Sequence, residues 1–110
     1  MRSAKVLFRD MEAGILTQHD DGAFTFRYHD TWAADGSKPS ISLTLPKYRR
    51  EFHSPYLFPF FFNMLPEGDN KAFICNYLRI DHDDYFGLLL HTAKSDPIGA
   101  VKVIKTEAQP

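Results

Sequence analysis

The chain has 110 residues, a formal net charge of −1 and an aromatic fraction of 15%. That length suits one domain and is too short for a protein kinase, a barrel, or a dinucleotide-binding enzyme with its substrate domain. The hydrophobic fraction of 44% excludes a disordered chain. The near-neutral charge gives no general attraction to nucleic acid or to anionic lipid. We expect a single domain over residues 1–106 and a flexible tail over 107–110.

The single cysteine, Cys75, excludes an internal disulfide and fits a reducing compartment. Because it lies next to Ile74 in a predicted helix, we expect it to be a small buried side chain rather than a nucleophile. The N-terminus has no apolar segment of signal-peptide length, and no apolar run is long enough to span a bilayer. These features predict a cytoplasmic protein.

The first half of the sequence predicts β-strands. A short apolar run is followed by a turn at residues 9–14, and Asp21-Gly22 is the strongest hairpin signal in the chain. Residues 24–28 and 41–45 alternate between apolar and polar side chains, which is typical of half-buried strands. Residues 30–39 read as a loop. The predicted strands are Lys5–Phe8, Ile15–Leu16, Phe24–Tyr28 and Ile41–Leu45, the last ending at Pro46.

The second half changes to the period of a helix. From Leu57 to Leu65, apolar residues recur at the three- and four-residue spacing of one helix face, and Pro66 ends that helix. Because Pro59 would break a helix that began at Pro55, the regular part is expected to start near Phe58. A second helix is predicted over 67–79, with Phe73, Ile74, Tyr77 and Leu78 buried. A third is predicted over 83–92, with Phe86, Leu89 and Leu90 buried, and residues 98–104 form a last strand.

Strands joined by hairpins, followed by a separate group of helices, indicate an α+β fold. We expect a small, mostly antiparallel sheet with three helices packed on one face. The last strand would rejoin the sheet after the helices have covered that face.

Two acidic clusters, His19-Asp20-Asp21 and Asp81-His82-Asp83-Asp84, have the composition of a metal or acid–base site. Both lie at predicted turns or helix starts, where aspartate caps the backbone, and neither shows the paired ligands of a zinc site. We therefore predict no catalytic residue, cofactor or metal. The basic residues 47–50 read as a solvated loop, and Trp32 as an anchor at the core edge with its indole N–H on a carbonyl.

Four ordered blocks give a specific family resemblance: Ser42–Pro46 (SLTLP), Pro59–Gly68 (PFFFNMLPEG), Asp84–Leu89 (DYFGLL) and Asp96–Val101 (DPIGAV). In this order and spacing they resemble the N-terminal subdomain 1 of HipA-type Ser/Thr toxin kinases. Nearly the whole chain is covered. In the full kinases this subdomain precedes the ATP-binding and catalytic parts, whereas the sequence here stops at Pro110. It is therefore similar to HipS, the small antitoxin of HipBST toxin–antitoxin systems.

The resemblance implies a non-catalytic antitoxin that binds and inhibits a HipT-like Ser/Thr toxin kinase by protein–protein docking. A HipB-like helix-turn-helix protein of the same complex would make any contact with DNA. We expect the kinase to contact the corner formed by Glu67, Gly68, Asp69 and Asn70. Many relatives carry Trp directly after Gly68, where this chain has Asp69, so a role for an aromatic inserted from that position does not carry over.

Three other functions remain open at this stage. The chain could be a detached structural subdomain of a full HipA-type kinase, without a regulatory role of its own. A small hydrolase would use the region of His82. Direct DNA binding is the weakest of the three, because no predicted helix has a basic face.

Overall fold

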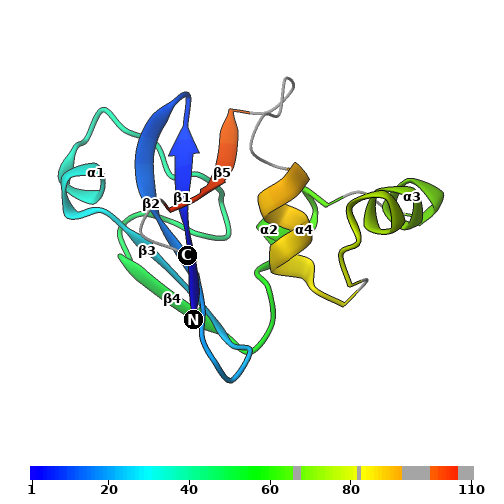
Figure 1. The fold of residues 1–110 in the computed structure, drawn as a ribbon. Helices are drawn as coiled ribbons and strands as arrows, with labels where there is room; N and C mark the ends of the chain where they lie inside the picture. The colour runs from blue at the N-terminus through cyan, green and yellow to red at the C-terminus, as the bar shows by residue number, and fades with distance from the viewer. Residues whose placement is uncertain (66–67, 82, 93–99, 107–110) are drawn as a thin grey trace.

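The computed structural model describes residues 1–65, 68–81, 83–92 and 100–106. Its core is one antiparallel sheet of five strands in the order β4-β3-β2-β1-β5 (Figure 1). The last strand rejoins the sheet, as the sequence predicted, and lies beside the first. The elements are β1 (Arg2–Phe8), β2 (Met11–Gln18), β3 (Phe24–Tyr28), α1 (Asp30–Ala34), β4 (Glu51–Ser54), α2 (Pro59–Phe62), α3 (Gly68–Leu78), α4 (Tyr85–Thr92) and β5 (Val101–Lys105).

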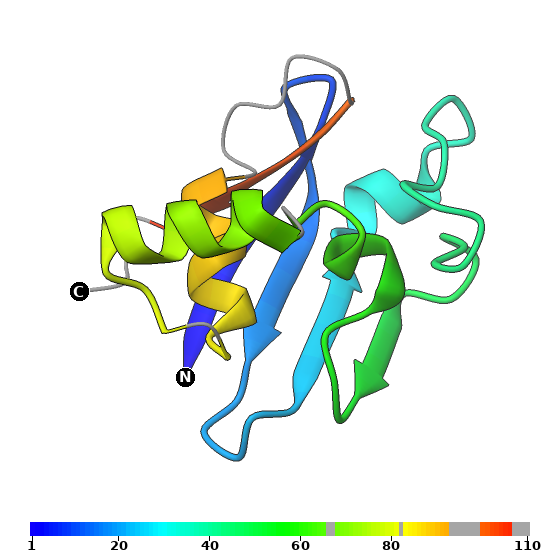
Figure 2. The same ribbon diagram turned by 90° about the vertical axis from the view of Figure 1, so that its right-hand side faces the viewer.

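The helices α2 and α4 lie beside the sheet, and α3 lies outside them, farther from the strands (Figures 1 and 2). This arrangement confirms the predicted α+β fold with three helices on one side of an antiparallel sheet. The fourth helix, α1, lies at the end of the molecule opposite α3 (Figure 1). It is a single turn within the predicted loop 30–39.

Aromatic side chains of β3 and α2 form the centre of the core. The Phe26 ring contacts the rings of Phe61 and Tyr28 at centroid distances of 5.8 and 4.8 Å, and all three side chains are fully buried. Phe24, on the same face of β3, stacks on Phe86 of α4 at 6.0 Å. Burying these rings supplies much of the driving force for folding.

The predicted strand over 41–45 is wrong, because this segment forms only an isolated bridge between Ser42 and Leu45. Ile41 and Leu45 are buried, but Leu43 is 99% exposed. The buried Tyr28 phenol holds the segment, since it accepts a bond from the Ile41 N–H at 3.0 Å and donates one to the Leu45 carbonyl. Removal from water raises the pKa of this phenol. The alternating pattern therefore comes from a loop whose two buried residues, Ile41 and Leu45, anchor it to the core.

The fourth strand is instead β4, at 51–54, where only Phe52 is apolar and buried. A four-residue strand with one core residue gives almost no periodic signal, which explains why it was missed. The first turn is also shorter than predicted. It consists of Arg9 and Asp10, both with positive φ, and β2 begins at Met11.

Three smaller predictions are confirmed. Trp32 is buried and its indole N–H donates to the Pro39 carbonyl at 2.9 Å. Helix α2 begins at Pro59 with Phe58 as its N-cap, and Cys75 is buried. Helix α2 ends at Phe62, four residues before the predicted end at Pro66, so that boundary is wrong. Residues 107–110, the expected tail, lie outside the described residues.

Candidate functional site

Helix α3 contributes little to the core although it has eleven residues. Cys75 is its one buried residue, and α3 forms the outer layer of the helical side (Figure 2). A helix of this length is marginal in water by itself and normally depends on burying one face. The exposed side of α3 is therefore the first place to search for a functional surface.

The exposed side of α3 carries an aromatic pair. The rings of Phe73 and Tyr77 stack at a centroid distance of 6.1 Å and an interplanar angle of 11°, and these residues are 67% and 77% exposed. Asp69 lies four residues before Phe73, which places it on the same side of the helix. We call Asp69, Phe73 and Tyr77 the α3 stripe.

The predicted burial of Phe73, Tyr77 and Leu78 is wrong, because all three are exposed, while Ile74 is partly buried. The sequence contained the signal for this result. Residues two apart on a helix point to nearly opposite sides, so a buried Cys75 is incompatible with burying Phe73 and Tyr77 unless the whole helix is enclosed.

The predicted partner-binding corner leads directly into the α3 stripe. Gly68, Asp69 and Asn70 are all exposed and form the first turn of α3. Gly68 has a φ of +58°, a left-handed conformation that glycine adopts without strain. Glu67, the fourth residue of the prediction, lies outside the described residues.

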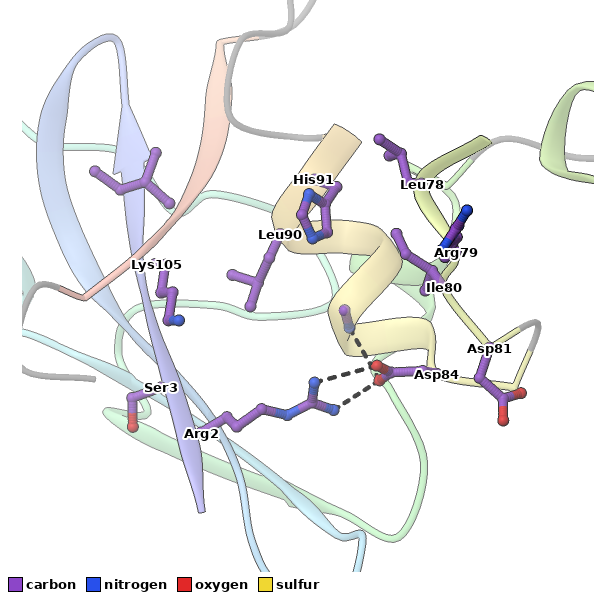
Figure 3. A pocket seen from close by; sticks show the side chains of 12 residues that line it. Arg2, Ser3, Leu78, Arg79, Ile80, Asp81, Asp84, Leu90, His91 and Lys105 are labelled. Atoms are coloured by element: carbon purple, nitrogen blue, oxygen red, sulfur yellow. Dashed lines mark hydrogen bonds and ion pairs between the residues drawn. The ribbon is translucent and has the colours of Figure 1, made fainter. Parts of the chain in front are cut away.

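A groove of about 590 Å³ separates the C-terminal end of α3 from β1 and β5. Its apolar lining includes Leu78, Ile80 and Leu90. An ion pair closes one side, where Arg2 Nη2 lies 2.7 Å from Asp84 Oδ1 and Arg2 Nη1 lies 3.2 Å from Asp84 Oδ2 (Figure 3). This bidentate contact joins the start of β1 to the start of α4.

The Asp84 carboxylate also accepts a hydrogen bond from the Gly87 N–H at 3.0 Å, so it caps α4. The Arg2 guanidinium is the main reason why the pKa of Asp84 lies below its usual value. The hydrogen bond from the Gly87 N–H lowers this pKa further, whereas partial burial raises it. A carboxylate that remains ionised in this way is not a proton donor at neutral pH. Asp84 therefore stabilises the structure in this groove.

The acidic clusters singled out in the sequence serve as turns where the structure describes them. Asp21 accepts a hydrogen bond from the Ala23 N–H at 3.0 Å, and Asp81 accepts one from the Asp83 N–H at 2.9 Å. His82 lies outside the described residues. Within the described parts of the chain, no three His, Cys, Asp or Glu side chains are grouped as metal ligands.

In the basic segment 47–50, the last three residues are exposed, and Arg50 Nη1 lies 3.1 Å from Asp30 Oδ1. Within the described ranges, no helix combines the length and apolar character that crossing a bilayer requires.

The fold is that of an α+β domain, and its most unusual surface is the outer helix with exposed aromatic rings. The family model described as the HipA N-terminal domain matches residues 4–104. The chain therefore belongs to the HipA N-terminal domain family, as the four sequence blocks indicated.

Individual relatives agree with this assignment. A solved structure described as the N-terminal domain of HipA toxin is 32% identical, with a TM-score of 0.73, and the match covers 99% of this chain and 96% of that one. A protein of Haemophilus influenzae named "Uncharacterized protein" is 32% identical over 94% of this chain and 92% of its own length. A Sinorhizobium fredii protein named "Putative kinase Y4mE" is 28% identical over 88% of this chain, but only 23% of its own length is matched.

Proposed function

We propose that this protein is a non-catalytic antitoxin that binds a HipT-like Ser/Thr toxin kinase and inhibits it by docking. The α3 stripe is the observation that carries the proposal. It extends from the predicted corner along the outer side of a helix that the rest of the chain barely encloses. The family match supports the proposal. So does the Haemophilus relative, because 92% of its length is matched by this chain.

The exposed rings give a physical reason for docking. Tyrosine and phenylalanine at the centre of an interface supply large contact areas and are frequent binding hot spots. Phe73 and Tyr77 are already stacked, so they would lose little side-chain freedom on binding. An apolar groove on the kinase that accepts one side of a helix is the matching shape.

Asp69 gives the stripe an acidic end. Kinases carry basic groups that bind phosphate, and an exposed carboxylate beside two aromatic rings complements such a surface. A stable complex requires an interface of about 1,200–2,000 Å² in total. The stripe alone is smaller than this, so the groove beside Leu78 is proposed as the continuation of the contact.

A HipB-like helix-turn-helix protein is proposed as a third component, and it would contact DNA. The net charge of −1 supports this division of roles, because it gives the present chain no general attraction to phosphate backbones.

The experiment is to mix the purified chain with the HipT-like kinase of the same organism. Co-elution in gel filtration and lower kinase autophosphorylation are expected. Tyr77→Ser should weaken both effects at least tenfold, as expected for a hot-spot tyrosine. Tyr48→Ser is the matched control, since Tyr48 is 88% exposed but lies in the segment before β4. A chain that neither co-elutes nor inhibits would refute the proposal.

A second function follows from the Sinorhizobium relative, in which a matching region is less than a quarter of a longer protein. Under this alternative the chain is a structural subdomain of a HipA-type kinase. It would then raise the stability or activity of a kinase that lacks the subdomain. Inhibition by an added chain supports the antitoxin, and activation supports the structural role.

A further inference from the structure

A second hollow, of about 290 Å³, has no residue of the α3 stripe in its lining. It opens between the β2–β3 hairpin, the segment before α2 and the start of α4. Its aromatic walls are Tyr56, Phe62 and Tyr85, and the buried Phe24 also lines it. Tyr56 and Phe62 are exposed, and the Phe62 and Tyr85 rings meet edge to face at 5.5 Å.

The hollow also has a polar wall, which Asp83 and Gln18 provide. Asp83 is exposed, and its carboxylate makes no ion pair with the described residues. None of the described lining residues is lysine or arginine. An aromatic hollow with one unneutralised carboxylate is complementary to a cation rather than to an anion or an alkyl chain.

The same chain already contains this arrangement in a filled form. The Arg2 guanidinium carbon lies 5.1 Å from the centroid of the Phe86 ring, and its nitrogens pair with Asp84. Arg2 Nε also donates to Gln18 at 3.0 Å. The filled site thus combines an aspartate, an aromatic residue two positions later and Gln18.

Shifted by one residue, the same pattern lines the hollow. Asp83 replaces Asp84 and Tyr85 replaces Phe86, whereas the amide oxygen of Gln18, which also lines the hollow, already accepts from Arg2. The Tyr85 ring attracts a cation even in the free chain, because Lys71 Nζ lies 4.9 Å from its centroid, although Lys71 is not a lining residue. The described chain supplies no arginine to the hollow itself.

We infer that this hollow binds an exposed arginine side chain of a partner protein. The guanidinium stacks on the aromatic walls and pairs with the Asp83 carboxylate, as Arg2 does with Phe86 and Asp84. Arginine fits better than lysine because its planar group both stacks and forms bidentate contacts. The inference goes beyond the proposed function, since it fixes the chemistry of a second contact without depending on which protein supplies the arginine.

The test is a titration of the isotope-labelled chain, followed by amide signals in NMR, with three small probes. They are the acetylated amides of arginine, of lysine and of citrulline, the last a neutral analogue of arginine. Saturable shifts around Gly22, Phe62 and Tyr85 are expected with arginine. Because a solvent-accessible cation–π contact with an ion pair is worth a few-fold in affinity, citrulline should bind at least about threefold more weakly.

Two variants and a control complete the test. Asp83→Asn and Tyr85→Leu should each weaken arginine binding by about two- to fivefold, while Tyr48→Leu should leave it unchanged. Equal binding of arginine and citrulline, tighter binding of lysine, or full binding by Asp83→Asn would each overturn the inference. These outcomes need no kinase, so they are independent of whether the chain inhibits one.

Discussion

The sheet and helix α3 use similar side chains in opposite ways. In the sheet region, phenylalanines from β3, α2 and α4 are buried against one another, and Phe26, Phe61 and Phe86 are fully enclosed. In α3, Phe73 and Tyr77 stack on each other and remain in water. Aromatic content therefore does not distinguish a core from a surface, whereas the side of the element on which a ring lies does.

This difference assigns separate roles to the two regions. Substitutions in the sheet region should change the free energy of unfolding, because they remove buried contacts. Substitutions on the α3 stripe should change binding and leave that free energy almost unaltered.

Phe61→Ala tests the sheet region most severely. The Phe61 ring contacts those of Phe26, Phe58 and Phe60 at centroid distances of 5.8, 6.4 and 5.2 Å. Its removal should lower the free energy of unfolding by about 3–5 kcal/mol, measured by urea denaturation followed by circular dichroism. A loss below about 1 kcal/mol would show that this cluster is not the centre of the core.

Gly14→Ala tests the packing between β2 and β3. An added Cβ would lie 2.4 Å from the Arg27 carbonyl oxygen and 3.0 Å from the Phe26 ring, so the sheet must shift. We expect a loss of about 1–3 kcal/mol in the same urea experiment. Gly36→Ala is the matched control, because its Cβ would meet nothing within 4 Å.

Asp84→Asn tests the link between the sheet and α4. The folded pKa of Asp84 is below its unfolded value, so its stabilising contribution is present above about pH 4 and is lost as the pH falls through the folded pKa. The variant should lose about 1 kcal/mol at neutral pH and show a flatter decline in stability toward acid. Asp69→Asn, a substitution on the exposed side of α3, should show the same decline in stability toward acid pH as the parent chain.

Tyr77→Ser should have the smallest effect on the free chain. Because Tyr77 is largely exposed, the free energy of unfolding should change by no more than about 0.5 kcal/mol in urea denaturation. A larger loss would mean that the stacked pair stabilises α3 itself. The loss of kinase binding could not then be attributed to a direct contact.

Strong periodic signals in the sequence predicted most of the fold. The alternation over 24–28, the Asp-Gly turn and the helical spacing around Phe61 each correspond to an element of the structure. The segments that were missed, β4 and α1, have four and five residues and one buried apolar side chain each. Such elements owe their conformation to contacts with other segments, since β4 pairs with β3 and the Trp32 indole of α1 donates to the Pro39 carbonyl.

The candidate site was predictable only in part. Motif resemblance located the corner at Gly68–Asn70, which the structure places in the exposed first turn of α3. The continuation along Phe73 and Tyr77 differs from the prediction of burial, because large aromatic residues are usually buried and these two are exposed. The hollow beside Asp83 brings together residues from the hairpin, the α2 approach and α4, a juxtaposition that no local pattern encodes.

The pairing of β5 with β1 sets an order for folding. Val101–Lys105 bonds to Ala4–Phe8, so one edge of β1 has no partner until residues 101–105 have left the ribosome. Closing so long a loop is slow, and an unpaired edge invites association with other chains. A nascent chain that is shortened before Val101 should therefore aggregate rather than accumulate as a stable intermediate.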